Sequence, residues 1–401
     1  MRKTLYILLS IILVFSGGSN CRGDRAQEDL PRLGVWITVF SPEKVLFSRE
    51  SADRLLRTCL KTGVKDIYLQ IYRADKAYYD SDITDRSSYE KMVLQAGTDP
   101  VDYILREARE KGLRVHAWIN LLSIAHNDEA NIIKRFGKDV ITVDQHGRTS
   151  LKGRKKDRLD DYYIRENQLF LEPGDERVRA YLEDIAVEIV RRYPLLAGLH
   201  LDYIRYPVIV PFVPGSRFTS HGISYGYTER NLRNFRDKTG LDASKMEGSR
   251  QNFKKWDDWR RDQVTALVGD ISRAVKEVSP LLEISCTIVP SMERTYLVTL
   301  QDWTVWLQEG YADYVVAMNY TDDLDLLKLN AKSLLLPGFE KEVHMGVGAY
   351  LLKQEPELIE EEIGLLLGLS PGGIVIFSYD DLAGNGRLQE YLAGKFLPEE
   401  D

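Results

Sequence analysis

The chain has 401 residues, 44% hydrophobic and 29% charged, so it can bury a large core as one big α/β domain or as two ordinary ones. Its 54 basic and 61 acidic side chains give a formal net charge of −7, which offers no electrostatic basis for a nucleic-acid partner. The one basic run, from Lys152 to Arg158, is followed at once by Asp160 and Asp161, and this mixture is typical of a solvated loop.

Residues 1–21 have the pattern of a secretion signal. A basic start precedes an apolar run from Leu5 to Phe15, which is too short to be a comfortable membrane span. Cys21 closes the segment, as the lipid-modified cysteine of bacterial lipoproteins does, although Gly18 and Asn20 depart from the residues usual before that cysteine. We expect a lipid on Cys21, and ordinary cleaved secretion or an uncleaved anchor are the alternatives.

A lipid on Cys21 would hold the mature chain on a membrane of the cell envelope through a polar tether over residues 22–32. Because Arg22 is no acidic retention signal, the outer membrane is the expected location in a cell that has one. Cys59 and Cys286 lie on apolar faces without CxxC spacing, which predicts buried free thiols.

From residue 33 onward, short β-branched runs alternate with amphipathic helical segments. Eight strands that alternate with helices most simply close into a single parallel (β/α)8 TIM barrel of the α/β class, and an open doubly wound sheet is the alternative. We expect this barrel over residues 33–398. The predicted strands are Gly34–Phe40, Asp66–Tyr72, Arg114–Asn120, Gly198–Tyr206, Leu282–Val289, Asp313–Tyr320, Val343–Tyr350 and Gly373–Tyr379.

In a barrel strand, one set of alternate side chains contacts the helices and the other faces the interior. Polar and apolar residues alternate in the second, third and fourth predicted strands, so Leu69 and Leu201 should contact the helices. The side chains expected inside are Tyr68, Gln70, Tyr72, His116, Trp118, Asn120, His200 and Asp202.

The same rule, applied to the eighth strand, turns Val375 and Phe377 toward the helices and Asp380 inward. Ordinary barrel cores are filled by Val, Ile and Leu. A polar and aromatic interior therefore indicates a ligand-binding mouth at the C-terminal strand ends.

The fourth strand reads "LHLDYIRYP" from Leu199 to Pro207, and here the chain resembles the bacterial glycosyl-hydrolase-like 10 family. A more distant likeness links it to other barrel glycosidases with a "DYIRYP"-type strand. The resemblance extends from residue 33 to about residue 382. It includes "LGVWITVF", "GVKDIYLQIYRADKAYYDSDI", "YILREAREKGLRVHAWIN", "ITVDQHGR", "FLEPGDERVRAYLEDIAVEIVRRY", "WRRDQV", "EISCTIVP", "ADYVVAMNY" and "IFSYDDL".

This resemblance implies a glycoside hydrolase that acts outside the cytoplasm on a bacterial polysaccharide, in particular the glycan strands of peptidoglycan. Family members commonly carry two successive aspartates on the fourth strand. Here the second position is Tyr203, so only Asp202 can inherit a catalytic role from that pair.

Glycoside hydrolysis usually needs two carboxyl groups, one on each side of the scissile bond. Asp202 is the first candidate, and Arg205 is expected to keep it ionised, as suits a nucleophile or base. For the second group we rank Asp380, then Glu293, then Asp322, each of which is alternatively a solvated or capping acid. The alternative for Asp202 is a structural ion pair with Arg205 or Arg73.

Aromatic rings pack on the flat faces of pyranoses, and polar side chains bond the hydroxyl groups. Some of these rings can instead be packing at the barrel rim. The side chains expected to bind sugar are Trp36, Gln70, Tyr72, Arg73, Trp118, Asn120, His200, Tyr203, Arg205, Tyr206, Asn319, Tyr320, Tyr350 and Tyr379.

Two long insertions, residues 121–174 and 208–255, follow the third and fourth strands. Both should rise beside Asp202 and shape a groove, since long loops in compact domains are often functional. Padding without a function is the alternative.

Two other functions stay open from the sequence. A noncatalytic glycan-binding lipoprotein would keep the aromatic groove without needing Asp202. A metal-dependent hydrolase or deacetylase could use His116, His200 and His344, but no HxH or HExxH spacing occurs, so we expect neither a metal nor another cofactor.

Overall fold

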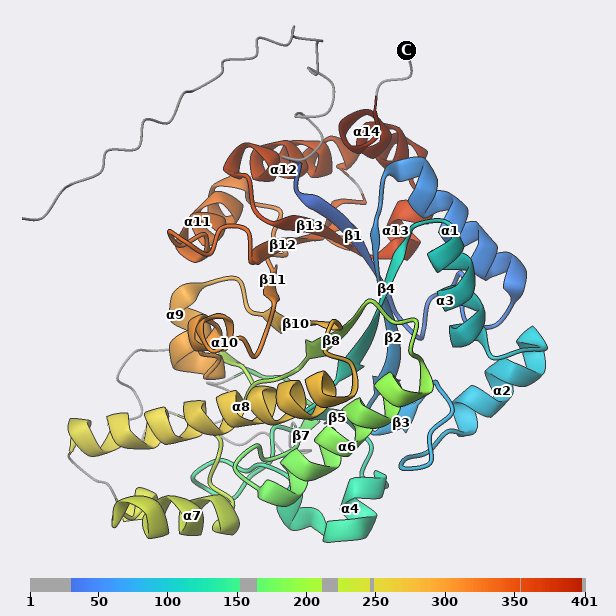
Figure 1. The fold of residues 1–401 in the computed structure, drawn as a ribbon. Coiled ribbons are helices and arrows are strands. Elements are labelled where there is room, and N and C mark those ends of the chain that lie inside the picture. The colour runs from blue at the N-terminus through green and yellow to red at the C-terminus, as the bar shows by residue number, and fades with distance from the viewer. Residues whose placement is uncertain (1–29, 152–163, 211–222, 246–248, 354, 399–401) are drawn as a thin grey trace, which may run out of the picture. The chain divides into compact units, whose positions relative to one another are not determined.

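The structure is a computed structural model that describes residues 30–151, 164–210, 223–245, 249–353 and 355–398 (Figure 1). Residues Pro31–Asp401 form one compact unit. The signal segment, Cys21, most of the tether and the basic run from Lys152 to Arg158 lie outside the described residues.

Eight parallel strands close into a barrel, which confirms the predicted fold class. The sheet runs in the order β1-β13-β12-β11-β10-β8-β4-β2, and β1 also pairs with β2, so no edge is left between the first and last strands. The strands are β1 (Arg32–Ile37), β2 (Asp66–Arg73), β4 (Arg114–Asn120), β8 (Gly198–Asp202), β10 (Glu283–Ile288), β11 (Tyr314–Met318), β12 (Val343–Gly348) and β13 (Gly373–Phe377).

Helices surround the strands and cover their outer face (Figure 1). Side-chain caps begin several of them where the sequence changes from loop to helix: Ser48 bonds the N–H of Ser51, and Asp175 bonds that of Arg177. The helices are α1 (Arg49–Thr62), α2 (Ser87–Ala96), α3 (Pro100–Glu110), α6 (Glu176–Arg192), α8 (Arg250–Val278), α9 (Met292–Arg294), α10 (Trp303–Gln308), α11 (Leu324–Leu334), α12 (Pro356–Leu369), α13 (Tyr379–Ala383) and α14 (Gly386–Phe396).

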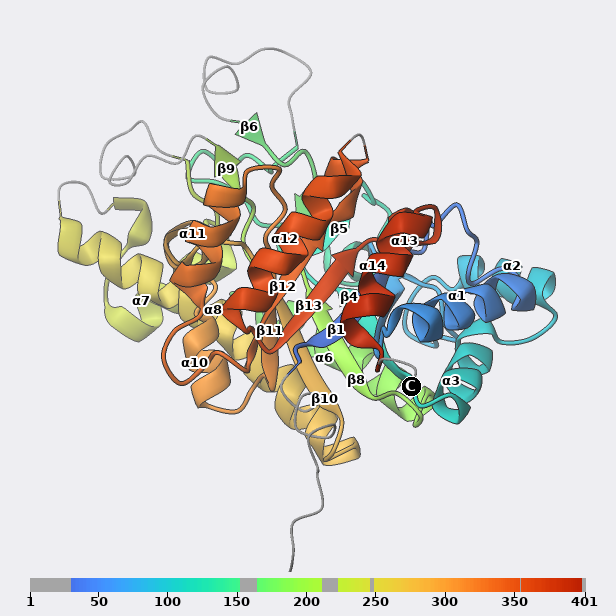
Figure 2. The same cartoon turned by 90° about the horizontal axis from the view of Figure 1, so that it is seen from above.

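The two long insertions contain small elements of their own. A two-stranded sheet joins β5 (Ser123–Ala125) to β7 (Leu169–Phe170), and another joins β6 (Ile164–Arg165) to β9 (Ile209–Val210). In Figure 2 the β6–β9 pair lies toward the C-terminal end of the barrel strands. The insertions also contain α4 (Asn131–Phe136), α7 (Glu229–Thr239) and the 3-10 turns at Lys138–Val140 and Ala243–Lys245. Elsewhere the described chain forms β3 (Lys76–Ala77), a π-helical turn at Thr295–Thr299 and a 3-10 turn at Ala349–Leu352.

The barrel interior is aromatic and polar, as the alternation in β2, β4 and β8 predicts. Leu69 and Leu201 belong to the apolar core outside the strands, whereas Tyr68 and Trp118 belong to a separate inner cluster. That inner cluster consists of Trp36, Tyr68, Trp118, Tyr314, Val316 and Val375, with Tyr320 and Phe377 packed against it.

The parity predicted for the eighth strand is wrong. Val375 and Phe377 of β13 face the interior, while Ile374 and Ile376 contact the helices. The inner layer here is built from rings, and the Phe377 ring stacks on Tyr320 with centroids 5.5 Å apart, so apolar side chains fit this layer as well as polar ones do.

Tyr72 was also predicted to face inward, and the structure places it outside the barrel. The register between β2 and β4 shifts after Gln70, so that Tyr72 pairs with Ile119 and joins the outer core. Its hydroxyl donates to the buried Asp75, which also accepts from Tyr181. A bulge of this kind reverses the face of every later residue in the strand.

A buried ion network closes the N-terminal end of the barrel. Arg32 donates to both oxygens of Asp66 at 3.0 Å, and His116 Nε2 lies 2.8 Å from Asp66 Oδ1. Burial raises the pKa of Asp66, but His116 and Arg32 outweigh burial and hold that pKa below its usual value. Glu283 joins the network through Arg32 and Arg114.

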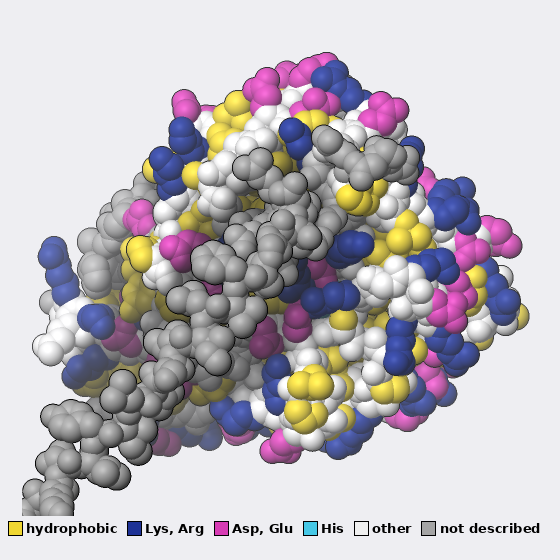
Figure 3. Space-filling view, turned by 45° about the horizontal axis from the view of Figure 1, so that its top comes forward, with side chains coloured by type: hydrophobic (Ala, Val, Ile, Leu, Met, Phe, Trp, Pro, Cys, Tyr) yellow, Lys and Arg dark blue, Asp and Glu magenta, His cyan; other side chains and the backbone are white. Residues whose placement is uncertain are grey.

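Figure 3 shows Lys and Arg side chains intermixed with Asp and Glu on the visible face of the molecule. Across the described ranges, no helix is both long and apolar enough to span a bilayer.

Glu362 of α12 provides a test of the packing between the outer helices. Its carboxylate is fully buried, and neither oxygen has a hydrogen-bond partner within the described chain. Burial, with a smaller contribution from the charge of Asp322, raises its pKa from 4.5 to about 8. Because the pKa of Glu362 is raised in the folded state, this residue costs the fold no stability below the unfolded-state pKa. The fold loses stability as the pH rises from there toward 8.

We therefore expect Glu362→Gln to unfold at a higher temperature than the parent protein at pH 9 and at a similar temperature at pH 4, with a gain on the order of 5 kcal/mol at the higher pH. Scanning calorimetry at both pH values measures this difference. The exposed neighbour Glu361 gives the matched control, Glu361→Gln, which should change neither curve. Equal melting curves for Glu362→Gln and the parent at pH 9 would contradict the burial of an ionising carboxylate.

Candidate active site

A pocket of about 290 Å³ opens among the C-terminal ends of the barrel strands. Eight of its lining residues were expected from the sequence: Trp36, Gln70, Arg73, Trp118, Asn120, Asp202, Tyr203 and Tyr320. Sequence reasoning missed five others: Thr38, Phe40, Thr287, Met318 and Phe377. Thr287 and Met318 occupy interior positions on β10 and β11, so extending the alternation rule to these strands would have found them.

Asp202 ends β8, and its carboxylate is buried, with 4% of the residue exposed. Three donors meet it. Thr287 Oγ donates to Oδ1 at 2.6 Å, the backbone N–H of Tyr203 donates to Oδ1 at 2.7 Å, and Trp118 Nε1 donates to Oδ2 at 3.0 Å. The carboxylate is therefore fixed in orientation by β4, β10 and the turn that follows it.

Burial raises the pKa of Asp202 above its usual value, against the lowering effect of these three hydrogen bonds and of Arg205. Arg205 favours the charged form of Asp202, as the sequence suggests, but burial has the larger effect on the pKa. A carboxyl group with a raised pKa can take up and release a proton nearer to neutral pH, as a general acid or base must.

Arg205 was expected to pair with Asp202, but it pairs with Glu166 of the first insertion. Both terminal nitrogens donate to Glu166 at 2.8 Å, in a two-pronged pair that is largely buried. The guanidinium also lies over the Tyr203 ring, 4.8 Å from its centroid. Arg205 thus joins the segment after β8 to the first insertion and does not line the pocket.

Tyr203 turns the chain sharply after Asp202. Its φ of 53° lies in the left-handed region, which a bulky residue rarely adopts. This turn brings its own N–H onto Asp202 and ends β8 four residues before the predicted end at Tyr206. Strain of this kind is found where a functional side chain must be held in place.

An amide pair forms another wall of the pocket. Gln70 donates through Nε2 to Asn120 Oδ1 at 3.0 Å, and Gln70 Oε1 accepts from the backbone N–H of Val39 at 3.2 Å. The remaining amide donors and acceptors suit sugar hydroxyl groups.

His200 lies one layer below and supports the pocket without lining it. Trp36 Nε1 donates to His200 Nε2 at 3.0 Å, and His200 Nδ1 lies 2.8 Å from Ser285 Oγ. Burial lowers the pKa of His200 well below its usual value, so the ring is neutral and its Nδ1–H donates to Ser285. His200 thereby fixes the indole of Trp36.

Aromatic side chains form the rim. Phe40, which follows β1, is 64% exposed, and the Arg73 guanidinium lies 4.8 Å from its ring centroid. Tyr350, after β12, is 42% exposed and meets Tyr320 edge to face at 6.0 Å. Tyr350 therefore stands beside a lining residue, although it does not itself line the pocket.

Three other aromatic or amide side chains expected to bind sugar lie outside the pocket lining. Tyr206 is buried and donates to Glu172 at 2.6 Å. Asn319 donates to the carbonyl of Leu327 at 3.0 Å and accepts from Asn330. Tyr379 is fully buried at the start of α13. The structure therefore places none of these three side chains, and not Tyr72 either, among the residues that line the pocket.

The acids ranked for the second catalytic position do not line the pocket either. Glu293 is exposed on α9, and Asp322 is exposed after β11. Asp380 is half-buried on α13 and accepts a hydrogen bond from Ser41, which follows the lining residue Phe40 in the chain. Among the described lining residues, Asp202 is the one acid.

The interior histidines have other partners than a metal ion. His116 bonds Asp66, and His344 stacks on Tyr314 with centroids 4.3 Å apart. Within the described ranges, no group of three or more His, Cys, Asp or Glu side chains is arranged to hold a metal.

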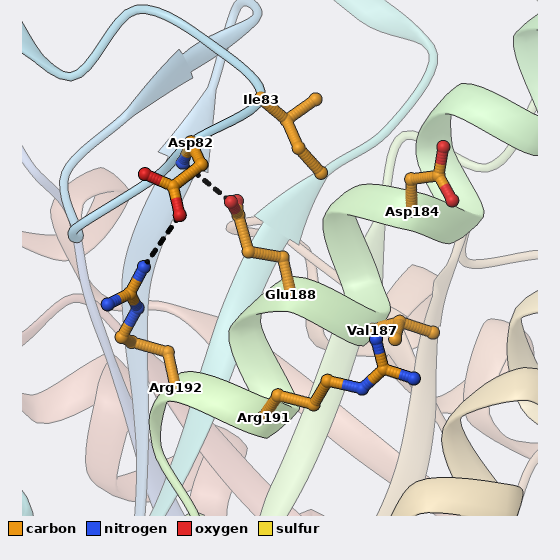
Figure 4. Close-up of a pocket in the computed structure, with 7 residues that line it drawn as sticks. All are labelled: Asp82, Ile83, Asp184, Val187, Glu188, Arg191 and Arg192. Carbon is orange, nitrogen blue, oxygen red and sulfur yellow. Dashed lines mark hydrogen bonds and ion pairs between the residues drawn. The ribbon is translucent and has the colours of Figure 1, made fainter.

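A second hollow, of about 490 Å³, lies on the outer side of α6 (Figure 4). Its polar groups largely bond one another: Glu188 accepts from the N–H of Asp82 at 2.6 Å, and Arg192 donates to the Asp82 carboxylate at 3.2 Å. These bonds connect the loop before α2 to α6, so this hollow lies between two surface elements that are bonded to each other.

Comparison with known proteins agrees with this geometry. Glycosyl hydrolase DigH of Escherichia coli K12 is 23% identical over 336 residues, which cover 76% of this chain and 68% of DigH. Glycosyl hydrolase YngK of Bacillus subtilis strain 168 is 25% identical over 320 residues, which cover 74% of this chain and 55% of YngK.

Among solved structures, the glycoside hydrolase domain of PgaB (BpsB) from Bordetella bronchiseptica superposes with a TM-score of 0.65 at 11% identity, covering 93% of this chain and all of that domain. At this identity the likeness shows the barrel fold. The family model described as glycosyl hydrolase-like 10 matches residues 32–332, and this match confirms the resemblance noted in the sequence. The chain belongs to the glycosyl hydrolase-like 10 family.

Proposed function

We propose that the chain hydrolyses glycosidic bonds of a bacterial cell-envelope polysaccharide, in particular the glycan strands of peptidoglycan, with Asp202 as the group that transfers a proton. The observation that carries this proposal is the buried Asp202 carboxyl, whose pKa burial raises, at the base of a pocket in the barrel mouth. Barrel enzymes place their chemistry at this end of the strands.

The composition of the pocket supports a sugar ligand. Trp36, Trp118, Tyr320 and Phe377 offer rings to the C–H faces of a pyranose, and the Gln70–Asn120 pair offers polar atoms to its hydroxyl groups. The similarity to DigH and YngK, both named glycosyl hydrolases, supports the same reaction class.

In the proposed reaction, Asp202 protonates the leaving glycosidic oxygen or activates the attacking water, in the manner of a glycosidase acid or base. Asp380 stays the predicted second carboxyl group, because its bond to Ser41 holds it next to the segment that supplies Phe40. Burial also raises the pKa of Asp380.

We further propose that the chain acts outside the cytoplasm, held on a membrane by lipid on Cys21, and on the outer membrane where the cell has one. The basic start, the apolar run and the following cysteine support this location.

Asp202→Asn tests the catalytic role. The substitution keeps the size and removes the proton-transfer group, so turnover of purified peptidoglycan glycan strands should fall roughly a thousandfold with thermal stability nearly unchanged. Mass spectrometry of released saccharides measures turnover. Glu309→Gln, at an exposed acid that follows α10, serves as the control and should keep full activity. Full activity of Asp202→Asn would leave a glycan-binding role in place of a catalytic one.

The pH profile tests the raised pKa of Asp202. If Asp202 donates the proton, kcat/KM falls as the pH rises through its pKa, and that alkaline limb should lie above the usual pKa of 3.8 because burial disfavours the charged form. Thr287→Val removes a hydrogen bond that favours the charged form, so it should move the limb further to alkaline pH. A shift to lower pH in this variant would contradict the role as proton donor.

Lipid attachment is tested by fractionation. Cys21→Ser should release the processed chain from membranes into the soluble fraction, as followed by immunoblot and by loss of labelled fatty acid. The proposal fails if the variant still sediments wholly with membranes. Cys59→Ser, at a buried thiol, controls for loss of a cysteine.

A further inference from the structure

We propose that Arg73 binds a carboxylate carried by the sugar in the pocket, so that the preferred substrate is a glycan with carboxylate-bearing residues. This inference rests on the proposed glycan substrate and narrows its chemical class.

Arg73 occupies the end of β2 and lines the same pocket as Asp202. The backbone turns back after it, since Arg73 pairs with Lys76 of β3, and this hairpin fixes where the side chain starts. Its guanidinium packs on Phe40, with 4.8 Å from Cζ to the ring centroid. Strand and ring together place the cation at the mouth.

The guanidinium of Arg73 forms no hydrogen bond or ion pair with any described residue. Other arginines near the barrel axis or the insertions are matched with acids: Arg32 with Asp66, Arg205 with Glu166, and Arg260 with Asp257. Arg73 is half-buried, and it is the one basic residue among the described residues that line the pocket.

A guanidinium is always charged and presents five N–H donors in a planar fork that matches a carboxylate. The contact with the Phe40 ring uses none of these donors in a hydrogen bond, so they are available to a ligand. An unpaired, half-buried cation that shares a pocket with a catalytic acid therefore points to an anionic group on the ligand.

The two charges of the pocket also orient that ligand. A carboxylate on the sugar is attracted by Arg73 and repelled by Asp202 whenever Asp202 is ionised. The sugar that bears the carboxylate should thus lie on the β2 side, where Arg73, Gln70 and Phe40 line the pocket, and leave the glycosidic oxygen to Asp202.

Two kinds of sugar supply such a carboxylate. Uronic acids carry it on the ring, and N-acetylmuramic acid carries it on a lactyl ether, where it is free only if no peptide is joined to it. The shared chemistry is the carboxylate, and a set of defined oligosaccharides separates the two sources.

The test measures binding, so that it does not depend on hydrolysis. Full-length protein with Asp202→Asn, which cannot consume the ligand, is titrated calorimetrically. The four ligands are a neutral N-acetylglucosamine tetrasaccharide, a peptide-free tetrasaccharide alternating N-acetylglucosamine with N-acetylmuramic acid, the same compound with its carboxylates converted to methylamides, and a tetragalacturonate.

We expect the free-acid muramyl ligand to bind about tenfold or more tightly than its methylamide, as a charge-assisted fork predicts. Adding Arg73→Gln should abolish this preference and leave the affinity for the neutral tetrasaccharide within about twofold. Arg73→Lys, which keeps the charge and loses the planar set of guanidinium donors, should retain part of the preference for the free acid. Arg191→Gln, at an exposed arginine on α6, is the matched control and should retain all of it.

Equal affinity for free-acid and methylamide ligands, or a preference that survives Arg73→Gln, would overturn the role of Arg73 while the proposed glycan substrate stands. Binding of none of the four ligands would overturn both. Tighter binding of tetragalacturonate than of the muramyl ligand would keep the carboxylate and Arg73 but would contradict peptidoglycan as its source.

Discussion

The buried carboxylate of Asp202, with its three hydrogen-bond donors, sets the arrangement of the barrel mouth. Burying a carboxylate costs on the order of several kcal/mol unless hydrogen-bond donors replace the lost water. Here β4 supplies Trp118 and β10 supplies Thr287, the two strands that flank β8 in the sheet. The third donor is the N–H of Tyr203, which is available only because that residue adopts the left-handed conformation.

The layers beneath extend the same principle down the barrel. Trp36, which lines the pocket, donates its indole N–H to His200, and His200 in turn bonds Ser285. At the lowest layer Arg32 and His116 satisfy Asp66. These hydrogen bonds hold several interior polar groups in place, so a barrel interior with little Val, Ile and Leu still supports the pocket above it.

The sequence predicted the barrel and most of the side chains at its mouth, since β2, β4 and β8 alternate polar and apolar residues with a clear period of two. It failed at Tyr72, because the register shift after Gln70 leaves no mark in the local sequence. It failed at Phe377 for a different reason. An apolar ring belongs equally well in an aromatic interior and against helices, so hydrophobicity alone does not decide its face.

The partner of Arg205 could not be identified from the local sequence. The sequence places the arginine three residues after the aspartate, which favours pairing between them. The folded chain instead brings Glu166 of the first insertion to Arg205, and both terminal nitrogens of the guanidinium donate to its carboxylate. Burial raises the pKa of Asp202, while its three uncharged donors and the charge of Arg205 lower it. Glu166, far from Asp202 in the sequence, thus holds the guanidinium of Arg205 in a pair of its own, and the three hydrogen bonds to Asp202 come from uncharged groups.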